Sequence, residues 1–343
     1  MGASSAIAFP PGRHRRVWRQ RFAAIVVLGS LLLTGALGCQ RQPPRLVLAM
    51  NPWPGYAYFA LAEARNFYAP RLRLDLRNLT DNESAVQSYI SGGAQAIATT
   101  VIDVVTICGV APERCPVIVY VINESRGGDQ VLARQDVKGL KGLVGRPIAL
   151  DRSSLSRYVL ARAFDSEGLS PPEPSQLRFL PPATWETALR QGKVQAVVTY
   201  PPRSEQLFRS QPLARLFTSR QLPYEILDVL AVEPELLSLH PDAVLALVQG
   251  WQAVRQEERR RPAAVRQEIA KYLGLDPVAG ASAWEGIRYP GPQEQYELLD
   301  PRQNNMPPLL EKIRKVLYAN GLIPANTPLP ATVDSIARGL QKA

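Results

Sequence analysis

Polar and aromatic side chains suited to holding a small molecule gather in five short segments of the sequence. Each segment follows a predicted strand, and the loops that follow the strands of an open parallel sheet meet at one edge, where ligands bind. Hydroxyl groups, carboxylates, glycines and aromatic rings at such an edge can hold a small polar ligand. The candidate ligand-binding residues are Trp53, Tyr56, Thr99, Thr100, Glu124, Ser125, Gly127, Ser153, Ser154, Arg157, Thr199 and Tyr200.

These candidates also have purely structural interpretations. The hydroxyls of the threonine pair, like those of Ser153 and Ser154, can cap helices. Gly127 can be a hinge turn, and Asp129 two residues later more often fixes a crossover than touches a ligand. Arg157 can hold a carboxylate, sulfonate or phosphate with two parallel hydrogen bonds, or it can form a surface ion pair. Both interpretations stay open at this level.

Catalytic arrangements are not evident in the sequence. Beyond residue 38 the only histidine is His240, which precedes Pro241 at a predicted helix start and has no cysteine nearby. We find no Ser-His-Asp or Cys-His set and no paired carboxylates with supporting partners. The sequence therefore predicts a protein that is not an enzyme and that uses no cofactor or metal ion.

Two of the three cysteines could bond to one another. Cys108 and Cys115 are separated by six residues, and in an oxidising compartment a disulfide between them would stabilise the fold by roughly 2–3 kcal/mol. Two separate buried thiols are an equal alternative.

The first 39 residues have the pattern of an export signal. Five arginines between Arg13 and Arg21 precede the uncharged apolar run 22–37, which at 16 residues is short for a membrane span of about 20. The run ends in Ala36-Leu37-Gly38-Cys39, which resembles a bacterial lipobox. We expect residues 1–38 to be removed and Cys39 to carry a lipid anchor, on the periplasmic or extracellular face of the cell membrane. An uncleaved N-terminal helix is the alternative.

Composition is that of a globular protein of moderate charge. Hydrophobic residues make up 46% and charged residues 20% of the 343 residues. Without residues 1–38 the net charge falls from +10 to +5, and 305 residues remain, enough for two lobes of roughly 100–200 residues each. No basic run with interleaved aromatic residues follows the leader, so nucleic-acid binding is not predicted.

Short apolar segments alternate with helical segments from residue 46 onward. Repeated strand–helix units predict parallel sheets with helices on both faces. The apolar, β-branched segment 116–122 is typical of a central parallel strand. Thr184 is expected to open a helix with a capping box, and Pro262 to break the helical segment 241–275. The predicted strands are 46–50, 72–79, 94–99, 116–122, 131–134, 145–151 (after its opening turn), 177–180 and 195–200; the predicted helices begin near residues 59, 82, 102, 153, 184, 203 and 241.

Several motifs in a fixed order resemble one protein family. The first is Trp53-Pro54-Gly55-Tyr56 with the helical segment 59–67 behind it, and the others are Ser125-Arg-Gly-Gly-Asp129 and the segments 137–146, 153–160, 186–201 and 240–251. Together they resemble the nitrate/sulfonate/taurine group of ABC-transporter substrate-binding proteins over most of residues 46–275.

This resemblance implies an α/β periplasmic-binding protein fold of type II, with two lobes, parallel-rich sheets and a ligand cleft between the lobes. Residues 39–45 would be a tether, residues 46–123 and 224–343 would form lobe 1, and residues 124–223 would form lobe 2. The implied function is capture of a small anionic or polar organic ligand, such as a sulfonate, a nitrate-like oxyanion or a pyrimidine. The lipid-anchored monomer would deliver this ligand to an ABC permease and its ATPase.

The sequence departs from the family pattern at one point that bears on the ligand, and two functions other than transport stay open. Tyr200-Pro201-Pro202 stands where the family usually has Trp-Glu-Pro, and the lost acid argues against an amine-bearing ligand, although Glu124 partly restores a carboxylate. A surface protein that senses its ligand without transporting it is one alternative. An enzyme of the branch that makes a thiamine pyrimidine is a weaker one, because its cysteine-rich motif has no counterpart here.

Overall fold

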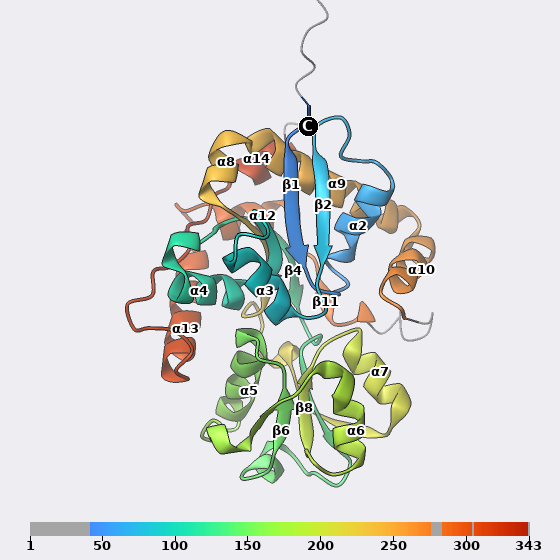
Figure 1. Ribbon diagram of the computed structural model, residues 1–343, viewed down its shortest axis with the longest axis vertical. Coiled ribbons are helices and arrows are strands. Elements are labelled where there is room, and N and C mark those ends of the chain that lie inside the picture. Colours follow the sequence, from blue (N-terminus) through green and yellow to red (C-terminus); the bar gives the residue numbers. More distant parts are fainter. Residues whose placement is uncertain (1–41, 276–282, 304, 342–343) are drawn as a thin grey trace, which may run out of the picture. The chain divides into compact units, whose positions relative to one another are not determined.

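The computed structural model describes residues 42–275, 283–303 and 305–341, and its strands form two separate β-sheets (Figure 1). The predictions for the signal peptide and for Cys39 lie outside the described residues. Within the described part, no helix combines the length and the hydrophobicity needed to cross a membrane.

The first sheet contains strands from both ends of this unit. Across the sheet they are β11 (Ile287–Arg288), β4 (Val117–Ser125), β10 (Leu227–Val232), β3 (Ala96–Thr100), β1 (Arg45–Met50) and β2 (Arg73–Asn78). β1 runs parallel to β2 and β3, whereas β10 is antiparallel to β3 and β4.

The second sheet repeats this plan with the middle part of the chain. Across it lie β7 (Leu177–Phe179), β6 (Ile148–Leu150), β8 (Ala196–Thr199), β5 (Gln130–Arg134) and β9 (Leu213–Thr218). β6 is parallel to β7 and β8, and β5 is antiparallel to β8 and β9. In each sheet, therefore, the first strand after the chain has crossed from the other sheet is antiparallel to its neighbours. This strand is β10 in the first sheet and β5 in the second.

One strand prediction is wrong in its details. The segment predicted as a central parallel strand is β4, and both of its neighbours, β10 and β11, run antiparallel to it. Its apolar, β-branched sequence reflects burial, which covers all but the first residue. Burial on both faces of a strand does not determine the direction of its neighbours.

Helices cover both faces of the first sheet because its side chains alternate between the faces. Leu46 and Leu48 pack on one side, while Val47 and Ala49 pack on the other. Figure 1 shows the two sets of helices on opposite sides. One set is α2 (Ala57–Ala64), α9 (Pro241–Arg260) and α10 (Pro262–Tyr272); the other is α3 (Asn82–Ile90), α4 (Val101–Val110) and α13 (Met306–Ala319), with α8 (Pro234–Leu239), α12 (Pro292–Leu299) and α14 (Ser335–Gln341) at the periphery.

The second sheet follows the same alternation on a smaller scale. Val131 and Val198 pack with α5 (Ser154–Ser166), whereas Leu132 and Val197 pack with α6 (Trp185–Arg190) and α7 (Arg203–Ser210). Figure 1 shows α5 on one side of this sheet and α6 and α7 on the other.

Two helix-boundary predictions have different outcomes. The break at Pro262 is confirmed, since α9 ends at Arg260 and α10 begins at Pro262. The capping box at Thr184 is wrong, because the Thr184 hydroxyl donates to the Pro181 carbonyl (2.8 Å) and caps nothing. Thr184 already closes a 3₁₀ turn, so its backbone is helical and not extended as an N-cap requires.

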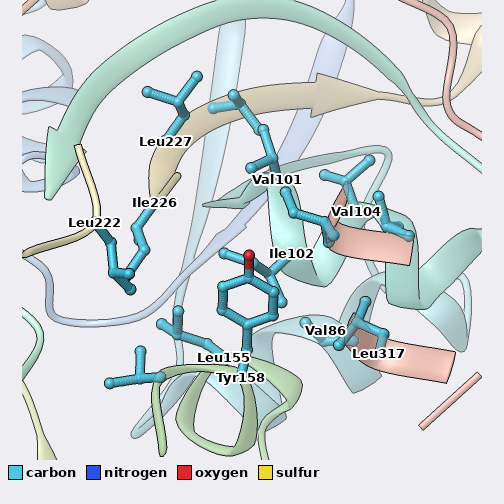
Figure 2. Close-up of a cluster of buried hydrophobic side chains, with 14 of the residues drawn as sticks. Val86, Val101, Ile102, Val104, Leu155, Tyr158, Leu222, Ile226, Leu227 and Leu317 are labelled. Carbon is cyan, nitrogen blue, oxygen red and sulfur yellow. The ribbon is translucent and has the colours of Figure 1, made fainter. Parts of the chain in front are cut away.

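An apolar cluster joins helices that pack on the two different sheets (Figure 2). Ile102 and Val104 of α4 contribute to it from the first sheet, and Leu155 and Tyr158 of α5 contribute from the second. Leu317 of α13 completes it beside both helices. The two lobes therefore share a buried apolar contact next to the region where their strands end.

A disulfide links the last turn of α4 to the segment that follows this helix. Cys108 and Cys115 are bonded with an S–S distance of 2.01 Å. Replacing both by alanine should lower the free energy of unfolding by about 2 kcal/mol, because the unfolded chain gains loop entropy. Guanidinium denaturation would measure this change. A reductant should destabilise the native protein similarly and leave the double variant unaffected; equal sensitivity of the two proteins would contradict the prediction.

Candidate functional site

A small cavity lies between the two sheets, at the edge where their parallel strands end. Asn51 directly follows β1, Thr100 ends β3, and Tyr200 directly follows β8. This is the position at which open α/β sheets bind ligands. The lining residues are Asn51, Trp53, Tyr56, Asn82, Thr100, Asp129, Leu155, Tyr200 and Asp228.

Behind the cavity wall, Asp103 of α4 accepts hydrogen bonds from four side chains. Asn82 Nδ2 (2.8 Å), Thr99 Oγ1 (2.9 Å) and Thr100 Oγ1 (2.6 Å) donate from within the first lobe. Ser154 Oγ donates from the second lobe, at 2.7 Å. Two of the predicted ligand residues, Thr99 and Ser154, therefore support this buried carboxylate and do not line the cavity.

A second buried carboxylate, Asp228 of β10, does line the cavity. The Tyr56 hydroxyl and Asn123 Nδ2 both donate to it. Asn123 Oδ1 in turn accepts from Trp53 Nε1 at 3.2 Å. Gly55 makes this arrangement possible, because a Cβ at that position would overlap the Asn123 side chain. The Trp53-Pro54-Gly55-Tyr56 segment is thus fixed by polar contacts with β4 and β10.

Aromatic rings from both lobes meet across the cavity. The rings of Trp53 and Tyr200 lie edge to face, with their centroids 6.2 Å apart. Asn51 Nδ2 donates to the Tyr200 hydroxyl at 3.3 Å. Trp53 also packs against the backbone of the crossover, where a Cβ on Gly128 would come within 2.5 Å of its ring. Of the predicted ligand-binding residues, Trp53, Tyr56 and Tyr200 line the cavity together with Thr100.

Three other predicted residues lie at the two crossovers, which are the segments that join β4 to β5 and β9 to β10. The hydroxyls of Ser125 and Ser219 lie 2.9 Å apart, and the Gly127 N–H donates to Ser219 Oγ (2.7 Å). Glu124 accepts from the Tyr224 N–H (2.7 Å) and pairs with Arg288. The Gly127 N–H is therefore hydrogen-bonded to the other crossover. None of the three residues lines the cavity.

The last three predicted residues have separate positions. Ser153 caps α5 by accepting from the Ser156 N–H (3.1 Å). Arg157 donates to the Asn320 carbonyl (3.0 Å), in a different surface depression. The Thr199 hydroxyl is buried beside Tyr200 and has no hydrogen-bond partner among the described residues.

Burial changes the protonation of the acidic side chains around the cavity. Burial, together with the nearby carboxylates of Asp103 and Asp151, raises the pKa of Asp129 to about 7, while the Ser125 hydroxyl acts in the opposite direction. Burial likewise raises the pKa of Asp228 well above its usual range. A positive charge placed beside such a carboxyl group would favour its ionised form.

Several lining residues were not among the sequence candidates. Asn51 and Leu155 lie in segments already identified as strand-end loops, so their positions carried a usable signal. Asp129 was assigned to the crossover, where it also is. Asn82 was expected only near a helix start, and Asp228 belongs to β10, a strand that the sequence pattern did not reveal.

Comparison with known proteins identifies the fold. The alkanesulfonate-binding protein SsuA from Xanthomonas axonopodis pv. citri, bound to MOPS, superposes with a TM-score of 0.68 at 16% identity, over 84% of this chain and 97% of that one. The periplasmic nitrate-binding protein NrtA from Synechocystis PCC 6803 gives 0.63 at 12% identity, over 88% and 86%. The desulfurization enzyme DSZB gives 0.60 at 17% identity, over 87% and 99%.

These similarities show the two-lobed periplasmic-binding protein fold that the sequence resemblance implied. No curated protein matches the sequence itself. The sequence does match the model of the NMT1-like family over residues 41–274. These residues include every residue that lines the cavity. The chain therefore belongs to the NMT1-like family.

Proposed function

We propose that this protein is an extracytoplasmic solute-binding protein, which captures a small ligand between its lobes and delivers it to an ABC permease. One observation carries the proposal: a cavity at the strand ends is lined by residues from both lobes, among them Asp129 of the first crossover and Asp228 of β10. A cavity built in this way changes when the lobes hinge, so that ligand binding and closure are coupled. The proposed lobes are residues 46–123 with 224–343, and residues 124–223.

The related structures support this function. SsuA and NrtA are named for the alkanesulfonate and nitrate that they bind, and both share the fold over most of the chain. A lipid anchor at Cys39 would keep the binding protein concentrated near its permease. The alternative, a ligand sensor without a permease, would use the same cavity.

An enzymatic function has less support, although DSZB shares the fold. No cysteine, histidine or lysine lines the cavity in the part of the chain that the structure describes. The lining hydroxyls of Thr100 and Tyr56 donate to the aspartates 103 and 228, an arrangement that fixes both groups in place.

Ligand binding should be detectable as stabilisation. A molecule present at 100 times its dissociation constant should raise the free energy of unfolding by about 2.7 kcal/mol. We expect the molecule that co-purifies with the protein, identified by mass spectrometry after denaturation, to restore this increase when it is added back. Recovery of the molecule unchanged after incubation would exclude turnover. If nothing co-purifies and no solute raises the melting temperature, the proposal fails.

Closure should depend on the hydrogen bond from Ser154 to Asp103, since it is a direct polar contact between the lobes. Ser154→Ala should shift the protein toward open conformations and weaken ligand binding several-fold, because a lost bond to a charged group costs roughly 1.5–3 kcal/mol. Small-angle scattering would show a larger radius of gyration. Ser166→Ala, at the exposed end of the same helix, is the matched control. Equal radii for both variants would contradict this role.

The raised pKa of Asp129 should lower the free energy of unfolding of the ligand-free protein as the pH rises from 4 through 7. Because the pKa of Asp129 rises from 3.8 to about 7 on folding, its favourable contribution is complete below pH 4 and is lost as the pH rises through 7. Asp129→Asn stays neutral, so it should be more stable than the native protein at pH 8, by at most ~4 kcal/mol.

Urea denaturation between pH 4 and 8 measures this difference, which should shrink toward pH 4. The carboxylates of Asp103, Asp151 and Asp228 act on Asp129 and remain in the variant. Asp242→Asn, at an exposed position in the first turn of α9, is the control. A variant that is less stable than the native protein at pH 8 would show that Asp129 stabilises the fold instead.

A further inference from the structure

The cavity is acidic, in contrast to the basic chain that surrounds it. Asp129 and Asp228 both line it, and no lysine, arginine or histidine does so within the described ranges. Arg203 acts electrostatically on Tyr200 but is not part of the lining. An oxyanion in this cavity would meet two carboxyl groups and no basic side chain. Once ionised, these carboxyl groups would repel an oxyanion strongly, because burial leaves little water to screen the charges.

The carboxyl groups behind the lining add to the same field. Asp103 and Asp151 act on Asp129, and Asp103 also acts on Asp228. The hydrogen bonds to Asp103 come from neutral amide and hydroxyl groups, which bring no positive charge to it. A bound cation would lower the electrostatic energy of all these groups at once.

Two buried oxygen atoms lack the hydrogen-bond donor that they require. Asn51 lines the cavity, and its Oδ1 is buried without a partner, while its Nδ2 donates to Tyr200. Asp151 Oδ2 is also buried without a partner, although Oδ1 accepts from Ser153. An amide oxygen can only accept, so the group missing at Asn51 is a donor; the same holds at Asp151 when its carboxyl group is ionised. A nitrate or sulfonate oxygen would bring further acceptors.

The remaining wall of the cavity is aromatic. Trp53, Tyr56 and Tyr200 surround the polar groups, and Leu155 contributes one aliphatic side chain. Aromatic faces attract cations, and the attraction is strongest where water is excluded. A flat cation can therefore contact rings and carboxylates together. Among the described residues no cluster of carboxylates could hold a metal ion, so a metal is not favoured.

We propose that the ligand is a small organic cation, a protonated amine or amidine whose N–H groups are held by Asp129, Asp228 and Asn51. This assignment rests on the proposed solute-binding function and names its ligand class. It departs from the expectation of an oxyanion and from the argument against amines at Tyr200-Pro201-Pro202. The acid missing there is replaced by carboxylates from the crossover and from β10.

Ring-matched probes test the charge preference directly. Benzamidinium and benzylammonium should bind at least tenfold more tightly than benzenesulfonate and benzoate in calorimetric titrations at pH 7.5. The molecule that co-purifies with the protein should carry a positive charge. Tighter binding of benzenesulfonate or nitrate would overturn the inference while leaving solute binding intact. No binding of any probe, together with no co-purified molecule, would reject both.

Variants separate a role in binding from a role in folding. Asp129→Asn and Asp228→Asn should each lower the affinity for benzamidinium at least tenfold and should not lower that for benzoate. Loss of structure would weaken both probes equally, so the ratio of the two affinities is the informative quantity. The exposed control Asp242→Asn should leave this ratio unchanged. An unchanged ratio in both cavity variants would overturn the assignment.

Discussion

The hydrogen bonds to Asp103 are the constraint on which the rest of the site depends. A buried carboxylate without partners would cost several kcal/mol, so every donor must be in place. Those donors come from the start of α3, from the end of β3 and from the first turn of α5 in the other lobe. Satisfying this one side chain therefore sets the position of three elements. It also fixes the edge of the cavity on which Asn82 and Thr100 lie.

Closure of the lobes combines this polar contact with a nearby apolar one. Ile102 of α4 and Leu155 of α5 belong to the same buried cluster, one turn or less from Asp103 and Ser154. The apolar contact supplies most of the energy, since burial of such side chains is worth roughly 1.5–3 kcal/mol each. The hydrogen bond adds direction, because it is made only when the first turn of α5 faces α4. Leu155 also lines the cavity, so contact between the lobes and contact with a ligand use the same segment.

The sequence predicted the framework better than the contacts. Apolar runs and the helix cap at Ser153 marked most strands and helices correctly, because these signals are local. Thr99 and Ser154 were selected because they follow strands, but their partner is Asp103, which no local pattern indicated. Asp228 was missed for a related reason. Its partners Tyr56 and Asn123 lie 172 and 105 residues away, and only the folded chain brings them together.

Net charge was a poor guide to the site for a physical reason. In the described part of the chain the positive charges lie mainly on exposed side chains, where water and salt screen them within about 10 Å. The cavity is governed by a few buried carboxyl groups, whose interactions are much less screened. A single substitution, such as the missing glutamate after Tyr200, is likewise uninformative when carboxylates from distant segments converge on the same space. The charge of a binding site is therefore a property of the fold, and the residues that decide it here are Asp129 from the crossover and Asp228 from the returning strand.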